Sequence, residues 1–156
     1  MTYLLIIFVI AVALAPLSHF VPSKRQREIA RMREYAAVHG MFVEFRRLPG
    51  SEAGRGKATG GSGKAGSQDT IYYGKRLPPP KNRAVRRQAW LRHGQEWRGL
   101  ERRVAIPAPL ALLPAPVLAA SMDDSSCGVY WREAGGEEPV ELIRQCLEDW
   151  SEQLRS

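Results

Sequence analysis

The stretch "GGEEPVELIRQCLEDWSEQLRS", residues 135–156, decides the fold more than any other part of this chain. Its apolar residues recur at spacings of three and four, which places them on one face of a helix. They are Val140, Ile143, Leu147, Trp150 and Leu154. Pro139 suits a first helical turn, and the glutamates around it complement the positive N-terminus. We therefore predict an amphipathic helix that covers a sheet, because two heptads are too short to favour the alternative, a coiled-coil seam.

Stretches typical of β-strands precede this helix. They are "MFVEFRRL" at 41–48, "DTIYYGKRL" at 69–77, residues 116–120, and "CGVYWRE" at 127–133. The first alternates apolar and polar residues, as a strand with one buried face does. We therefore predict one α+β domain over 41–156, a small antiparallel sheet covered by the C-terminal helix.

The stretch "RQAWLRHGQEWRGL", residues 87–100, is typical of a β-hairpin. A two-residue turn at His93 and Gly94 would place Trp90 opposite Trp97. A cross-strand aromatic pair stabilises a hairpin by up to about 1 kcal/mol. Two roles remain open for the pair, packing within the fold or an aromatic surface that binds a ligand.

The first 22 residues, "MTYLLIIFVIAVALAPLSHFVP", contain no charged side chain. At about 1.5 Å per residue, some 20 helical residues match a hydrocarbon core of about 30 Å. Basic residues follow this run, which favours the cytoplasm for that side. We therefore predict a transmembrane anchor over 1–22 in a single-pass bacterial inner-membrane protein, with a periplasmic N-terminus and a cytoplasmic C-terminal domain. The alternative is a signal sequence, cleaved or uncleaved, on an exported envelope domain.

A basic juxtamembrane helix is predicted over 23–40. Ser23 and Gln26 match a capping box, and Gly40 stands where a C-terminal cap is expected. Of the 23 Lys and Arg residues, 20 precede position 104, so the positive charge lies in the part of the chain that follows the apolar run. Basic residues beside a membrane are attracted to anionic lipid. The residues predicted to contact the membrane surface are Lys24, Arg25, Arg27, Arg31 and Arg33. The alternative is a solvated spacer helix.

The stretch "GRGKATGGSGKAGSQD", residues 54–69, contains Gly-Lys twice. A phosphate-binding loop needs Gly-x-x-x-x-Gly-Lys-Ser/Thr, between a strand and a helix. Ala58 and Ala65 occupy the first-glycine and hydroxyl positions here. We therefore predict a flexible Gly-rich insertion over 49–69 and no nucleotide site.

The sequence lacks Gly-x-Ser-x-Gly, His-Glu-x-x-His and dinucleotide fingerprints. Cys127 and Cys146 lack metal-ligand spacing. They are predicted to be buried thiols in a reducing compartment, or a disulfide in an oxidising one. The prediction is a protein that is not an enzyme, with no cofactor and no metal site.

The first 47 residues, including "PSKRQREIARMREYAAVHGMFVEF" at 22–45, resemble the start of YajC-type accessory subunits of bacterial preprotein translocase. The resemblance implies an N-terminal span, a basic helix and a cytoplasmic β domain. It implies no binding residue, and it ends before residue 48.

These observations predict a non-enzymatic accessory or scaffold subunit that associates with a membrane protein complex or an anionic lipid surface. One alternative is the exported envelope domain. Another is a membrane-tethered nucleic-acid-binding module, because "RRQAWLRHGQEWRGLERR", residues 86–103, mixes basic and aromatic residues. The nucleic-acid alternative is the weakest of the three, because lipid already accounts for the basic charge.

Overall fold

The computed structural model describes residues 1–15, 22–50, 70–79 and 87–155. Most of the predicted Gly-rich insertion, residues 51–69, lies outside the described residues. The elements are α1 (Thr2–Leu14), α2 (Lys24–Val38), β1 (Met41–Arg46), β2 (Thr70–Arg76), β3 (Gln88–His93), β4 (Glu96–Gly99), the 3-10 helix η3 (Ala108–Leu112), β5 (Val117–Met122), β6 (Ser126–Trp131) and α3 (Glu137–Gln153).

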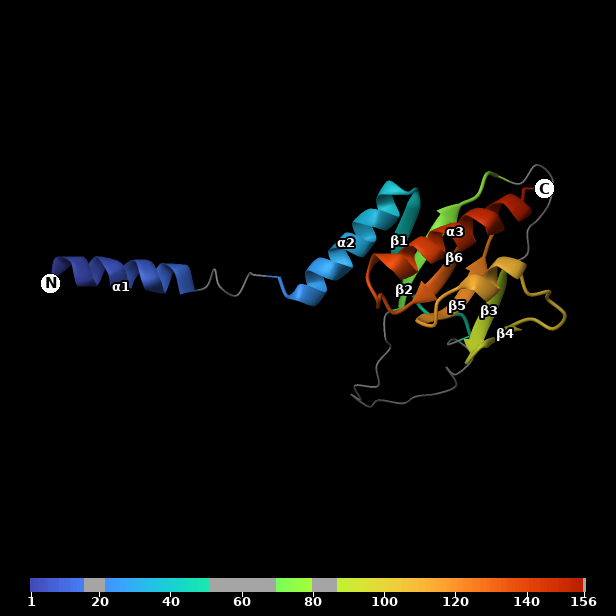
Figure 1. The fold of residues 1–156 in the computed structure, drawn as a ribbon, viewed down its shortest axis with the longest axis horizontal. Coiled ribbons are helices and arrows are strands. Elements are labelled where there is room, and N and C mark those ends of the chain that lie inside the picture. Colours follow the sequence, from blue (N-terminus) through green and yellow to red (C-terminus); the bar gives the residue numbers. More distant parts are fainter. Residues whose placement is uncertain (16–21, 51–69, 80–86, 156) are drawn as a thin grey trace, which may run out of the picture.

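The six strands form one sheet in the order β1-β2-β6-β5-β3-β4. Every neighbouring pair in the sheet is antiparallel. The helices α2 and α3 lie on one face of this sheet (Figure 1). This arrangement confirms the predicted α+β class, with an antiparallel sheet and a C-terminal helix.

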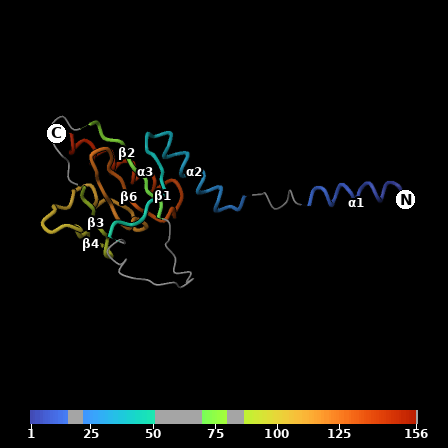
Figure 2. The backbone as a smooth tube through the Cα atoms, turned by 180° about the vertical axis from the view of Figure 1, so that it is seen from behind, coloured from blue at the N-terminus to red at the C-terminus, as the bar shows by residue number. Residues whose placement is uncertain are grey.

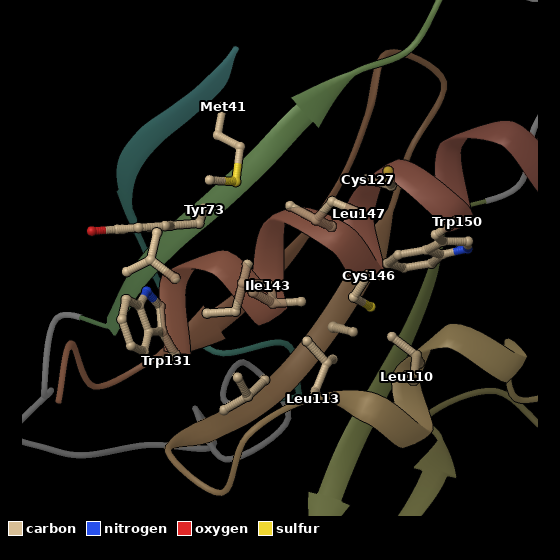
Figure 3. Close-up of a cluster of buried hydrophobic side chains, with 14 of the residues drawn as sticks. Met41, Tyr73, Leu110, Leu113, Cys127, Trp131, Ile143, Cys146, Leu147 and Trp150 are labelled. Carbon is tan, nitrogen blue, oxygen red and sulfur yellow. The ribbon is translucent and has the colours of Figure 1, made fainter. Parts of the chain in front are cut away.

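The main core lies between the sheet and α3. Val140, Ile143 and Leu147 are fully buried, and Trp150 is 1% exposed. Figure 3 shows Ile143, Cys146, Leu147 and Trp150 in this layer, with Trp131 and Tyr73 from the strands. Because successive strand side chains point to opposite faces, Tyr72 and Tyr130 lie on the other face in a second, smaller cluster.

Leu154 was also predicted on the buried helical face, and this was wrong. Helix α3 ends at Gln153, and the side chain of Leu154 is 39% exposed. A spacing pattern extends past the point where a helix ends, so it cannot locate that end by itself.

The predicted hairpin exists, but its register differs from the prediction. Trp90 pairs with Gly99, and Trp97 pairs with Arg92. The turn residues are therefore Gly94 and Gln95, and Gly94 has a φ of +65°. A two-residue type II′ turn needs positive φ at its first position only, which glycine supplies without strain. The pairing shifts by two residues, so both tryptophans stay on the same face of the sheet.

Helix α2 has both predicted caps, and its bounds, Lys24–Val38, lie inside the predicted range 23–40. The Ser23 side chain accepts a hydrogen bond from the Gln26 N–H, and the Gln26 side chain accepts one from the Ser23 N–H. Gly40 follows the helix with a φ of +75°. Met32 and Ala36 are buried, so α2 is packed into the domain and is not a solvated spacer.

The predicted transmembrane anchor over 1–22 is wrong. None of the helices in the described residues is both long and apolar enough to cross a membrane. Helix α1 has 13 residues, which is about 20 Å of helix against a hydrocarbon core of about 30 Å. The predicted single-pass topology, the inner-membrane location and the sidedness of the two ends are overturned with it. The prediction counted apolar residues to position 22, whereas helix α1 stops at Leu14, shortly before Pro16.

Candidate functional site

Helix α1 exposes an unusually large apolar surface. None of its residues is buried. Ten of its large hydrophobic side chains are exposed, from 47% for Ile6 to 81% for Tyr3. The helix lies apart from the sheet and its covering helices in both views (Figures 1 and 2). Contiguous apolar patches of this kind mark contact sites for proteins or membranes.

The start of α2 carries four exposed basic residues. They are Lys24, Arg25, Arg27 and Arg31, which we call the basic cluster. The segment from Lys24 to Arg31 contains a single acid, Glu28. Arg27 donates a hydrogen bond to the carbonyl of Pro22 at 3.1 Å, and this leaves its charge uncompensated. The basic cluster is therefore a positively charged surface that follows the apolar helix in sequence.

Arg33, the fifth basic residue predicted to contact a membrane, binds inside the domain. Its Nε and Nη2 donate to Oε1 and Oε2 of Glu133 at 2.7 and 2.8 Å. The Tyr73 hydroxyl also donates to Oε1, at 3.0 Å. The Glu133 carboxylate raises the pKa of Arg33 through these hydrogen bonds. Two parallel N–H···O bonds fix geometry as well as charge, so this pair fixes the position of α2 on the sheet.

A second contact joins α2 to the C-terminal helix. The Tyr35 hydroxyl donates to Glu141 of α3 at 2.7 Å. Glu141 also accepts from Arg144 at 2.8 Å, from both Nε and Nη2. The basic cluster is therefore carried by a helix that two separate polar contacts attach to the domain.

The predicted tryptophan pair belongs to the core. Trp90 is 1% exposed and Trp97 is 8% exposed. The Trp90 ring packs edge to face on Trp150, at 5.5 Å between centroids, and its indole N–H donates to the Ala105 carbonyl. Arg92 lies over the Trp97 ring. Neither ring is available as a surface for a ligand.

The two cysteines are buried and free. Burial raises the pKa of each thiol to about 12. The Cys146 thiol donates to the carbonyl of Pro109 at 3.3 Å. Thiols in such surroundings are unreactive at neutral pH. Within the described ranges, no group of three His, Cys, Asp or Glu side chains could hold a metal ion.

The second face of the sheet carries a polar and aromatic cluster that the sequence analysis missed. The Arg46 guanidinium lies over the Tyr72 ring, 4.0 Å from its centroid. Tyr72 is fully buried and Tyr130 is 6% exposed. Burial raises the pKa of Tyr72 to about 12. Single-stranded nucleic acid stacks on accessible rings, and these rings are covered, so the face does not support the nucleic-acid alternative.

Asp123 closes the turn between β5 and β6. Its Oδ1 accepts from the N–H and hydroxyl of both Ser125 and Ser126, at 2.7 to 3.1 Å. Burial alone would raise the pKa of Asp123, but the four hydrogen bonds hold it below its ordinary value.

Replacing Asp123 with asparagine is expected to reduce the free energy of unfolding by about 1 kcal/mol at neutral pH. A carboxylate with a lowered pKa stabilises the fold above its unfolded pKa of about 3.9. That contribution disappears as the pH falls through the folded pKa. Urea unfolding at neutral and acidic pH should therefore show the difference shrinking on acidification. A difference that is the same at both pH values would contradict this account, and Asp124→Asn, at an exposed position, is the control.

Comparison with protein-family models, with curated proteins and with solved structures finds no match for this chain. The resemblance of residues 1–47 to YajC-type subunits therefore stays a prediction. The function must be inferred from the described geometry, in which the exposed helix α1 and the basic cluster are the main features.

Proposed function

We propose that this chain is a non-enzymatic accessory or scaffold protein that attaches its α+β domain to an anionic lipid surface without crossing it. The observation that carries the proposal is that the apolar helix α1 buries none of its residues. We infer that the partner is anionic lipid, because the exposed basic cluster follows α1 and complements negatively charged headgroups.

The apolar contribution outweighs the electrostatic one. Side chains that are 47% to 81% exposed gain at least about 1 kcal/mol each on burial, half of the value for a full transfer. The ten large side chains of α1 together exceed the roughly 1 kcal/mol that each basic residue near a membrane contributes. Attachment to the membrane should therefore depend mainly on α1. The basic cluster should add an electrostatic contribution to the binding free energy, which decreases as the salt concentration rises.

The length of α1 fits shallow insertion. A helix of this length is about 20 Å long and about 10 Å wide. Its surface is apolar on all sides, whereas an interfacial amphipathic helix keeps one polar face in water. We infer that α1 lies among the acyl chains of one leaflet, with the basic cluster at the headgroups.

The non-enzymatic part of the proposal rests on the chemistry of the described residues. Both thiols are buried with raised pKa values. Glu133, the most deeply buried carboxylate, is fully occupied by Arg33 and Tyr73. These groups support the fold, and we assign none of them a catalytic role.

Flotation with vesicles of phosphatidylcholine and phosphatidylglycerol tests the proposal. The full chain is expected to float with the vesicles. The double substitution Ile7→Asp and Phe8→Asp should abolish flotation, because a charge inside the hydrocarbon costs about 3 kcal/mol. Replacing the four basic-cluster residues with glutamine should weaken binding by up to about 1,000-fold, from roughly 1 kcal/mol for each residue, and remove most of its salt dependence.

The matched control places two aspartates on the domain instead, at the exposed apolar positions Ile106 and Leu112. This variant should float like the unmodified chain. Circular dichroism should show that all variants retain the fold, since α1 buries no residue. The proposal would be overturned if the full chain stayed monomeric in solution and did not float with the vesicles. A chain that forms a defined oligomer through α1 without lipid would also overturn it.

A further inference from the structure

A cavity of 340 Å³ lies where α2 begins, beside the start of β2 and the end of β6. We call it the end cavity. Its wall includes Arg25, Ile29, Leu118, Trp131, Arg132 and Glu133. Arg25 belongs to the basic cluster, so the end cavity opens on the part of the domain that follows α1 in sequence.

The end cavity has an excess of positive charge. Arg25 and Arg132 are exposed on its wall. Glu133 is its only acid among the described lining residues, and both of its oxygens already accept hydrogen bonds from Arg33. Arg33 neutralises this carboxylate, so the charges of Arg25 and Arg132 remain for a ligand.

One lining residue, Trp131, carries an unsatisfied donor. Trp131 is fully buried, and its indole N–H has no hydrogen-bond partner in the part of the chain that the structure describes. Buried N–H groups almost always have a partner. Ile29 and Leu118 supply apolar surface in the same cavity.

We propose that the end cavity binds a phosphate group, and that the phosphate belongs to a lipid headgroup. Two guanidinium groups recognise phosphate oxygens well, and Trp131, whose indole N–H has no partner among the described residues, lines the same cavity. Ile29 and Leu118 then contact the glycerol and the first acyl carbons. The inference rests on the proposed attachment to lipid and adds a specific headgroup contact to it.

The test uses the full chain with Ile7→Asp and Phe8→Asp, which keeps the domain and removes the general attraction of α1 for lipid. Two probes are titrated into this protein in separate experiments. One is dihexanoyl phosphatidic acid, a short and soluble lipid, and the other is inorganic phosphate. The indole N–H resonance of Trp131, assigned by its loss in Trp131→Phe, should shift with both. The short lipid should bind about tenfold more tightly, because it also buries apolar surface.

Two substitutions locate the site. Arg25→Gln and Arg132→Gln should each weaken binding about tenfold, as the loss of one charged hydrogen bond does. Arg98→Gln is the matched control, because Arg98 is 70% exposed on the edge strand β4. Thermal unfolding should show that the three variants are equally stable.

Three results would count against the inference. No shift at millimolar concentrations of either probe, or shifts that survive both arginine substitutions, would overturn the site. Equal affinity for inorganic phosphate and the short lipid would overturn the headgroup assignment. None of these results would affect flotation of the unmodified chain through α1, so failure here is distinguishable from failure of the proposed function.

Discussion

Replacing Gly128 with alanine is expected to destabilise the domain by about 3 kcal/mol, at the upper end of the usual cost of overpacking. Gly128 lies in the central strand β6, and the Tyr72 ring crosses directly over it. A Cβ at position 128 would lie 2.3 Å from Cζ and 2.5 Å from Oη of Tyr72. It would also lie 2.5 Å from the backbone carbonyl oxygen of Tyr73, which cannot rotate away.

Gly74→Ala is the matched control for this prediction. The atoms nearest to a Cβ at position 74 would be ring atoms of Phe42 and Tyr72, at 2.6 Å each. Side-chain rings can turn more easily than a strand backbone can shift, so the loss should be smaller, about 1 to 2 kcal/mol. Urea unfolding measures both variants. A Gly128→Ala protein as stable as the Gly74→Ala protein would contradict the described packing of Tyr72.

Replacing Arg33 with glutamine is expected to cost about 3 kcal/mol of unfolding free energy, because it leaves a buried carboxylate without its charged partner. The Glu133 side chain is 5% exposed, whereas the Arg33 side chain is 36% exposed. Glu133→Gln should cost less, about 1 kcal/mol, since water can solvate the remaining guanidinium and the amide oxygen can still accept from Tyr73.

The order of these two effects is the informative result. Denaturant unfolding of both single variants and of the double variant gives the coupling energy between the two side chains. Arg31→Gln, an exposed change two residues away on the same helix, should leave stability nearly unchanged. Equal losses for Arg33→Gln and Glu133→Gln would contradict the claim that the carboxylate is the buried partner.

Local patterns in the sequence predicted the elements of the fold. The capping box at Ser23 and Gln26 and the apolar spacing from Val140 to Trp150 depend on residues close together in the chain, so they can be read without the structure. The hairpin at 88–99 was also predicted, but its register was not. The sequence of this hairpin is compatible with a turn at His93–Gly94 and with a turn at Gly94–Gln95. The structure has the second, in which Gly94 takes the first turn position with a positive φ.

The N-terminal prediction failed for a physical reason. Composition through residue 22 gave enough apolar length for a span, but a span needs one continuous helix. Helix α1, the apolar helix that the structure describes, has 13 residues. Hydropathy indicates how favourably a segment transfers from water into lipid, but it does not locate the end of a helix.

The candidate site was predictable only in part. The basic cluster could be read from its position after the apolar run. The bond between Arg33 and Glu133 joins residues 100 positions apart, and the stacking of Arg46 on Tyr72 depends on the pairing of β1 with β2. Contacts of this kind follow from sheet topology, which local patterns do not specify.

The most direct test of the account asks whether α1 enters lipid. Phe8→Cys introduces one exposed thiol at a position that is 68% exposed, while Cys127 and Cys146 stay buried and unreactive. An environment-sensitive fluorophore on this thiol should shift to the blue when vesicles containing phosphatidylglycerol are added, and nitroxides on the acyl chains should quench it. A fluorophore whose emission stays as it is in water, with vesicles in excess and the domain folded, would contradict the account.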